Sequence, residues 1–222
     1  MYVEYHDHFS NEVYQATACY VIWKNLQNQP AEDNDLLKSL NINALSWVFI
    51  RHSMMVSLIM ALGRIFDTDG ESVSVDDLIK SCITDIGLFT KSSLRERKSK
   101  SHNASEWIDS YMESTYEPSE SDFQRLKPKI KKYRDIFNNY YKPIRHKIFA
   151  HSDKQSLTQT NELWNATKDA NIEDMLNFLD DLKITLQETY QNGRKPELKG
   201  RKIDEEWFAK DIQSLLQRVK NA

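Results

Sequence analysis

The residue types best suited to chemistry gather in one short segment, residues 140–153, which reads YYKPIRHKIFAHSD. Arg145 stands six residues before His151, and His146 follows the arginine directly. A guanidinium presents a planar set of hydrogen-bond donors, and an imidazole changes charge near neutral pH and can transfer protons. The segment is therefore the strongest candidate in the chain for a site that carries chemistry.

Helical geometry limits how these two side chains can work together. On a straight α-helix, Arg145 and His151 are about 120° apart around the axis and about 9 Å apart along it. They do not easily hold one phosphate from there, so either the helix ends or bends between them or Arg145 of a second chain completes the site. A plainer interpretation stays open, because His151 follows Ile144 and Ile148 on the apolar stripe, where a histidine commonly packs in the core.

The spacing of Arg145 and His151, with the polar His146 after the arginine, resembles the Arg-x4-6-His motif of the HEPN superfamily. Residues 149–153, FAHSD, look more like one branch, the HEPN proteins associated with abortive phage infection. The run LGRIFD at residues 62–67 is also similar to the central helix of that branch. The resemblance implies an all-α bundle that pairs as a homodimer and brings two motifs into one cleft.

Catalytic HEPN proteins cut RNA without a metal, so the resemblance also implies roles for individual residues. Arg145 would stabilise the negative charge that develops on the phosphorane, and His151 would transfer the proton of the ribose 2′-hydroxyl or of the leaving oxygen. His146 would orient the phosphate or share the proton transfer. The implied function is RNA binding, with metal-independent endoribonuclease activity, in phage defence or a toxin-like role. Many HEPN domains are not catalytic, so a module that binds a partner protein, including a neutralising one, or nucleic acid stays open as the alternative.

Basic residues are concentrated around this segment. Residues 91–154 contain 15 Lys and Arg against 9 Asp and Glu, although the whole chain has a formal net charge of −3. The overall acidity disfavours tight nonspecific DNA binding, whereas a local basic band can attract a polyanion. We therefore predict RNA contacts from six lysines: Lys127, Lys129, Lys131, Lys132, Lys142 and Lys147. The alternative is that these lysines only solvate a helix face.

Three other groups of residues carry weaker signals. Residues 6–8, His-Asp-His, have metal-capable side chains but no further clustered ligand, so we expect an exposed tail and no metal or other cofactor. Arg64 and Asp67 are three residues apart on a helix and are predicted to pair with each other, and the alternative is that Arg64 faces the same cleft in the folded bundle. Cys19 and Cys82 lie in apolar settings and are predicted to be buried, reduced thiols, as in a cytoplasmic protein.

The composition predicts the fold class that must position these residues. Only 5 Gly and 5 Pro occur in 222 residues, and no segment alternates β-branched residues over any length. We expect an all-α fold, a bundle of long antiparallel helices with additional short helices. It should form a single domain over 1–222, with a core of about 40–190, an N-terminal helix in 1–39 and a C-terminal helix in 203–222.

Caps and helix breakers predict where the helices begin and end. The expected helices are 10–28, 35–66 with an interruption near 41–43, 74–90 with an N-cap at Ser74, 106–114, 121–148 with interruptions at Pro128 and Pro143, 158–168, 172–191 and 204–220. Residues 91–105 are expected to form an exposed loop or a frayed helix end. From Leu45 onward the second helix is apolar nearly all round, which predicts a central helix. The most apolar stretch, 54–62, is too short to cross a membrane, and no signal peptide precedes it.

Overall fold

The computed structural model describes residues 1–68, 72–146, 167 and 169–221, and within these ranges the chain is helical and contains no strand. The predicted all-α class is therefore confirmed. Lys147, His151 and nearly all of the helix predicted at 158–168 lie outside the described residues. The helices are α1 (Tyr2–Glu32), α2 (Asn34–Ile42), α3 (Ala44–Ile65), α4 (Val75–Thr84), the 3₁₀ helix η1 (Ile86–Phe89), α5 (Lys91–Ser99), α6 (Ala104–Glu113), α7 (Glu120–Gln124), α8 (Lys127–Tyr140), α9 (Lys142–Ile144), α11 (Asp169–Asn192) and α12 (Glu206–Lys220).

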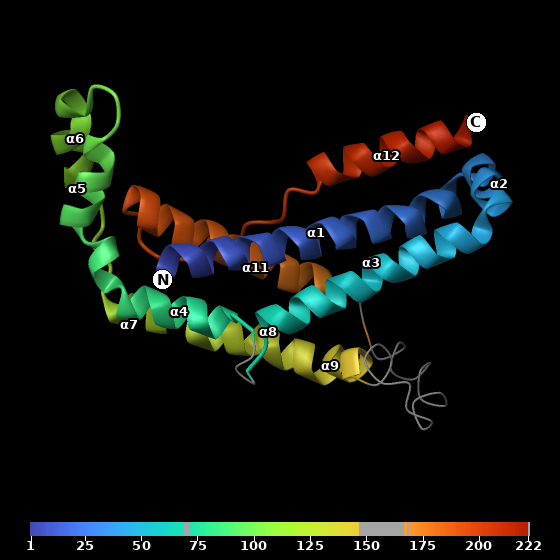
Figure 1. The fold of residues 1–222 in the computed structure, drawn as a ribbon, viewed down its shortest axis with the longest axis horizontal. Helices are drawn as coiled ribbons and strands as arrows, with labels where there is room; N and C mark the ends of the chain where they lie inside the picture. Colours follow the sequence, from blue (N-terminus) through green and yellow to red (C-terminus); the bar gives the residue numbers. More distant parts are fainter. Residues whose placement is uncertain (69–71, 147–166, 168, 222) are drawn as a thin grey trace.

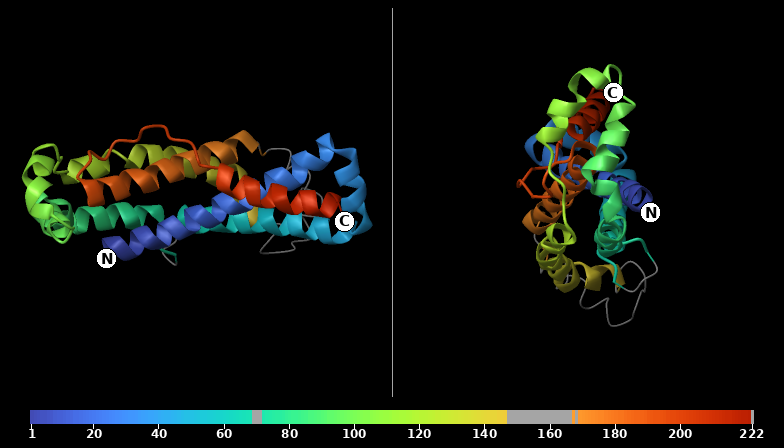
Figure 2. Two further views of the ribbon diagram at one scale, coloured as in Figure 1. Left: turned by 90° about the horizontal axis from the view of Figure 1, so that it is seen from above. Right: turned by 90° about the vertical axis from the view of Figure 1, so that its left-hand side faces the viewer.

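The helices form an elongated bundle around α1 (Figures 1 and 2). α1 and α3 run antiparallel along each other and are joined by the short α2 at one end of the molecule (Figure 1). α11, α12 and α4 also pack against α1, whereas α8 lies beside α4 and leads into α9 below α3 (Figure 1). α5 and α6 project together at the opposite end from α2. This topology brings α9 back to the central helix α3.

The main core joins α1, the C-terminal half of α3, α4, α8 and α11. Its fully buried side chains include Val13, Leu58, Ile59, Leu62, Leu78, Phe137, Tyr141 and Leu179. Two smaller clusters lie at the ends of the bundle. One joins α1, α2 and α12 around Leu26, Leu36 and Leu216, and the other joins α5 and α6 around Leu94, Ile108 and Met112.

Local signals explain several helix ends as predicted. Ser74 accepts a hydrogen bond from the backbone N–H of Asp77, whose carboxylate accepts one from the backbone of Ser74, so this predicted cap is a capping box. Pro128 and Pro143 lie at the starts of α8 and α9, where a missing N–H costs little. Gly193 follows α11 with φ 58°, the left-handed conformation that ends many helices.

The N-terminal prediction is wrong, because α1 begins at Tyr2 rather than at residue 10 and continues through Pro30 to Glu32. Tyr2 is buried in the main core, and its hydroxyl donates to the Leu186 carbonyl at 3.1 Å. His6 is also buried, with Nε2 donating to the Lys183 carbonyl at 3.1 Å, so residues 6–8 belong to a core helix and not to an exposed tail. Tertiary packing extends the helix beyond its local start and stop signals.

Residues 91–105 are also more ordered than predicted. α5 occupies most of this segment, and Thr90 caps it by accepting a hydrogen bond from the Ser93 N–H at 3.2 Å. Arg97 ties the helix down, because its guanidinium donates to the Leu88 carbonyl at 2.8 Å and to the Tyr190 carbonyl at 2.7 Å. The preceding helix ends at Thr84, and a 3₁₀ turn replaces its predicted last part.

α3 is only half central. Its C-terminal half is buried in the main core, but Leu45, Val48 and Phe49 in its N-terminal half are 71, 54 and 61% exposed. The whole 22-residue helix is long and apolar enough to cross a membrane, which the stretch 54–62 alone is not, but core helices share this property. The prediction of a central helix therefore holds only for the second half of α3. Its first half presents an apolar surface to solvent.

Candidate functional site around Arg145

Arg145 is positioned by the junction between α8 and α9. Tyr141 and Ile144 are fully buried, and they fix the chain against the main core on both sides of Pro143. The Arg145 N–H donates to the Tyr141 carbonyl at 3.0 Å, so the helical turn continues through the proline. Arg145 and His146 then adopt the wider π-helical conformation, which occurs frequently at functional sites. The end or bend predicted between Arg145 and His151 lies outside the described residues and stays a prediction.

The side chain of Arg145 lies directly against Gly63 of α3. A β-carbon at position 63 would be 2.9 Å from Cδ of Arg145 and 3.0 Å from both Nε and Nη1. Real β-carbons do not approach other atoms this closely, so only glycine lets the arginine rest on the backbone of α3. Gly63 is buried within a helix, where glycine costs about 1 kcal/mol relative to alanine. Its position here is explained by the seat that it provides for Arg145.

No carboxylate neutralises Arg145 within the described parts of the chain, because none of the ion pairs and side-chain hydrogen bonds found there involves its guanidinium. Arg64, the next residue of α3, forms two hydrogen bonds with Glu12 of α1, at 2.9 Å from Nε and 2.8 Å from Nη2. The predicted pairing of Arg64 with Asp67 is therefore wrong, since a bond between helices replaces the one within the helix.

The other residues of the motif are placed only in part. His146 is exposed beside Arg145, and Lys142 is half-buried. The predicted proton-transfer residue His151 and the predicted RNA contact Lys147 lie outside the described residues. The structure thus brings together Arg145, His146 and Gly63, and the predicted role of His151 stays a prediction.

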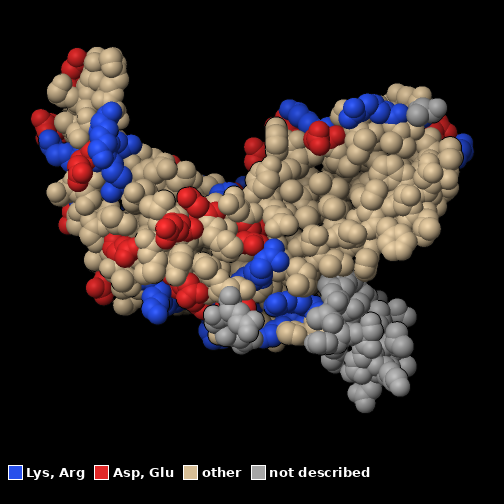
Figure 3. Space-filling view, in the orientation of Figure 1, with Lys and Arg blue, Asp and Glu red and all other residues tan. Residues whose placement is uncertain are grey.

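The predicted RNA-binding lysines of α8 are not on one face. Lys127 and Lys131 are about one turn apart on α8, whereas Lys129 and Lys132 point roughly the opposite way. Lys131 forms a surface ion pair with Asp135 at 2.6 Å. Lys129 and Lys132 line a hollow toward α11 instead. Figure 3 shows basic side chains along the lower edge of the molecule, where α8 and α9 pass under α3.

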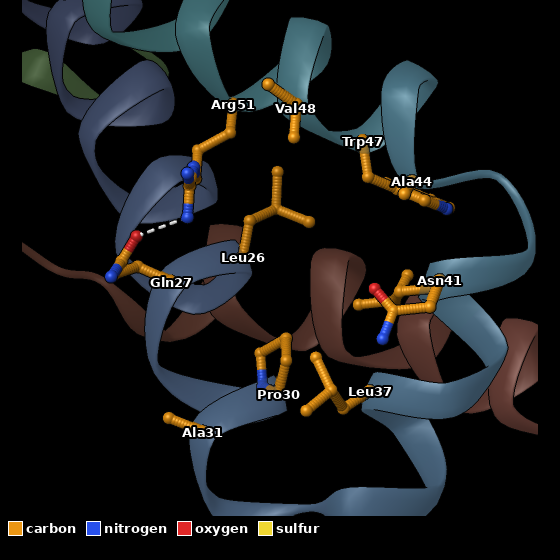
Figure 4. Close-up of a pocket in the computed structure, with 11 residues that line it drawn as sticks. Leu26, Gln27, Pro30, Ala31, Leu37, Asn41, Ala44, Trp47, Val48 and Arg51 are labelled. Carbon is orange, nitrogen blue, oxygen red and sulfur yellow. Dashed lines mark hydrogen bonds between the residues drawn. The ribbon is translucent and has the colours of Figure 1, made fainter.

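A separate hollow, of about 280 Å³, lies between the C-terminal half of α1, α2 and the N-terminal half of α3 (Figure 4). Its lining is mostly apolar and includes Leu26, Pro30, Leu37, Trp47 and Val48. Arg51 crosses one side and donates to the Gln27 side-chain oxygen at 2.6 Å (Figure 4). The surface around it carries few charged side chains (Figure 3). This hollow is suited to apolar side chains and not to a phosphate.

The sequence did not assign a role to Gly63 or to Glu12. A signal existed for the glycine, because an isolated Gly within an apolar helical pattern commonly marks close backbone approach. Glu12 had no local signal, since its partner Arg64 is 52 residues away in the chain.

An all-α fold with an arginine at the end of α9, followed directly by a histidine, fits the HEPN motif that the sequence resembles. The comparison with protein families agrees, since the family model described as AbiU2, of the HEPN group, matches residues 2–219. The chain belongs to this AbiU2 family of HEPN proteins, a family associated with abortive infection. No curated protein and no solved structure matched the chain.

Proposed function

We propose that this protein binds RNA and cleaves it without a metal, as part of a defence that aborts phage infection or acts like a toxin. The observation that carries the proposal is the guanidinium of Arg145, seated on Gly63 and without a carboxylate partner among the described residues. An arginine in this state can bind a phosphodiester through two parallel hydrogen bonds and stabilise added negative charge on it.

The proposed reaction uses the nucleophile within the RNA itself. The ribose 2′-oxygen attacks phosphorus, the bond from phosphorus to the 5′-oxygen breaks, and the products are a 2′,3′-cyclic phosphate and a 5′-hydroxyl. One group must remove the proton of the 2′-hydroxyl, and one must deliver a proton to the leaving oxygen. His151 is proposed for proton transfer, with His146 sharing it or orienting the phosphate, and Arg145 stabilises the phosphorane.

The test is cleavage of labelled single-stranded RNA in the presence of a chelator, by the wild type and by Arg145→Ala and His151→Ala. Loss of cleavage in both variants supports the proposal, as does a 2′,3′-cyclic phosphate on the product. Equal cleavage by all three proteins would exclude the assigned site. Thermal unfolding of each variant separates a catalytic defect from a folding defect.

We also propose that a second copy of the chain covers the open face of α3. The exposed apolar side chains there and on α2 are Leu37, Ile42, Leu45, Val48 and Phe49, at 41, 81, 71, 54 and 61% exposure. A fully exposed side chain of this size has a surface on the order of 150–200 Å², so the exposed fractions of the five side chains together present roughly 500–600 Å² of apolar surface. That approaches the roughly 800 Å² that each partner contributes to a typical stable interface. A two-fold pair would set the same patch against itself and fill the hollow of Figure 4 with projecting side chains.

α3 carries both this face and Gly63. Leu45, Phe49 and Gly63 lie on one side of α3, because their separations of 4 and 14 residues are close to whole helical turns. A second copy on α3 would therefore extend toward Arg145. Sedimentation equilibrium should give a dimer for the wild type and a monomer for Phe49→Glu, with the exposed Leu215→Glu on α12 as the control. A monomeric wild type at all concentrations would contradict the pairing.

The alternative function is a binding module without turnover, and the same apolar face favours it. In that case the purified protein cleaves no RNA, and Phe49→Glu abolishes the biological effect while Arg145→Ala leaves it intact. The two variants thus separate an RNA-cleaving protein from an interaction module.

A further inference from the structure

The two most basic stretches of the chain lie side by side in the fold. Residues 125–132 contain five Lys and Arg and no acid, and residues 194–202 contain five against one. The first stretch leads into α8, and the second belongs to the connector between α11 and α12, which runs along α11 in both views of Figure 2. Two adjoining hollows, of about 150 and 480 Å³, are lined by residues of both stretches. We call the larger one, with its rim, the basic groove.

The connector is a fixed wall of this groove. Asp181 of α11 is buried, and its carboxylate accepts hydrogen bonds from the Gly200 N–H at 2.7 Å and from Arg201 Nη1 at 2.8 Å. Asn177 of α11 accepts a further bond from the Ile203 N–H at 2.9 Å. Gly200 has φ 70°, so the connector turns there in a conformation that favours glycine. The charges of the connector are therefore held at defined positions beside α8.

Among the described residues, some cations of the groove pair with an acid and others do not. Asp181 neutralises Arg201, whereas Lys129, Lys132 and Lys202 are exposed and form no ion pair within the described ranges. One exposed carboxylate, that of Asp174, also lines the hollow. The unpaired charge is thus +2 when this acid is set against the three lysines. The groove is built to attract an anion with more than one negative charge.

An aromatic ring stands next to these lysines. Tyr133 of α8 lines the hollow, is half-buried, and stacks on Phe178 of α11 with ring centroids 4.3 Å apart and an interplanar angle of 16°. Lys132 places its Nζ 5.0 Å from the centre of the same ring. Lysines beside a supported aromatic ring are the combination that holds single-stranded nucleic acids, since phosphates bind the cations and a base stacks on the ring. An acidic polypeptide would bind the lysines through its carboxylates but has no base to stack on the ring.

We propose that the basic groove binds a single-stranded segment of RNA, with Lys129, Lys132 and Lys202 on phosphates and Tyr133 against a base. The inference rests on the proposed function and extends it, because the groove is separate from the cleavage site. The groove is lined by residues of α8, α11 and the connector, whereas Arg145 lies beyond the end of α8, against Gly63 of α3. The groove therefore holds RNA at a distance from Arg145, so that docking and cleavage depend on different residues.

The test measures binding of the full-length protein to a fluorescent single-stranded 2′-O-methyl RNA, which cannot undergo 2′-hydroxyl attack, over a series of salt concentrations. The triple variant Lys129→Gln, Lys132→Gln, Lys202→Gln should bind at least about 10-fold more weakly near 0.1 M salt. The slope of log K against log salt should fall by about 2, at ~0.7 for each phosphate that a lysine no longer neutralises. Tyr133→Leu should weaken binding at least about 5-fold without changing that slope.

The matched control neutralises three lysines that form ion pairs outside the groove, Lys38, Lys210 and Lys220, and so changes the net charge equally. Its binding should stay close to that of the wild type. If both triple variants lose the same affinity, the groove has no special role and the inference is overturned. Equal competition by poly-glutamate also overturns it. Failure of the wild type to bind or cleave any RNA would instead overturn the proposed function itself.

Discussion

Gly63→Ala tests whether the close contact with Gly63 positions Arg145, because it changes that contact and keeps the arginine itself. The added methyl group would lie 2.9 Å from Cδ and 3.0 Å from Nε and Nη1 of Arg145, whereas ordinary contacts of this kind are 3.4–4 Å. The arginine must therefore move by at least a few tenths of an ångström, and its flexible stem permits this at little cost in stability. The same substitution raises helix propensity by about 1 kcal/mol within α3.

Stability and activity should therefore change in opposite directions. We expect the melting temperature of Gly63→Ala to stay equal or rise by a few degrees, because about 1 kcal/mol of helix propensity is gained. Cleavage should fall by about 10- to 100-fold, since displacing a charge-stabilising group by up to about 1 Å costs rates of that order. Single-turnover cleavage of labelled RNA measures the rate, and calorimetry measures the melting temperature.

The control is Gly87→Ala in η1, where an added β-carbon meets nothing within 4 Å. It should leave cleavage unchanged. If Gly63→Ala cleaves RNA at the wild-type rate while Arg145→Ala is inactive, the seat does not position the guanidinium, and the reasoning from the close approach of the two residues fails.

Three further predictions concern stability. Burial lowers the pKa of the His6 imidazole below its ordinary 6.5, so below about that pH the unfolded chain binds more protons than the folded chain does. Thermal unfolding should therefore show that stability falls as the pH drops from about 7 toward 5. The fall should be smaller in His6→Gln. Asp181→Ala removes the acceptor of Gly200 and Arg201 and should cost about 1–3 kcal/mol in urea unfolding, with faster proteolysis of the connector. Leu62→Ala leaves a cavity in the main core and should cost about 2–5 kcal/mol by the same measurement, whereas a change under 1 kcal/mol would contradict the assigned core.

Local sequence signals predicted the fold class and the interior helix ends well. The capping box at Ser74, the break near Asn43 and the terminator at Gly193 are set by side chains within a few residues, so the sequence alone is enough to find them. The burial of Cys19 and Cys82 as thiols was predicted for the same reason, from their apolar surroundings.

Features that depend on distant parts of the chain were not predictable in this way. α1 extends to Tyr2 because the ring of that residue and the imidazole of His6 reach carbonyls of α11, more than 170 residues away. Arg64 prefers Glu12 on another helix to its local neighbour Asp67. The packing of Arg145 on Gly63 joins two segments of the family motif that the sequence shows only separately.

The small cluster between α5 and α6 has a consequence for cooperativity. Only Leu94, Ile108 and Met112 are buried in it, and this end is otherwise attached to α11 mainly through polar contacts such as those of Arg97 and Tyr111. This end buries much less apolar surface than the main core does. It should therefore unfold locally, at a free energy well below that of global unfolding. Amide protons of α5 and α6 would then exchange early while those of α3 stay protected. The contact between Arg145 and Gly63 would then stay intact while α5 and α6 unfold locally.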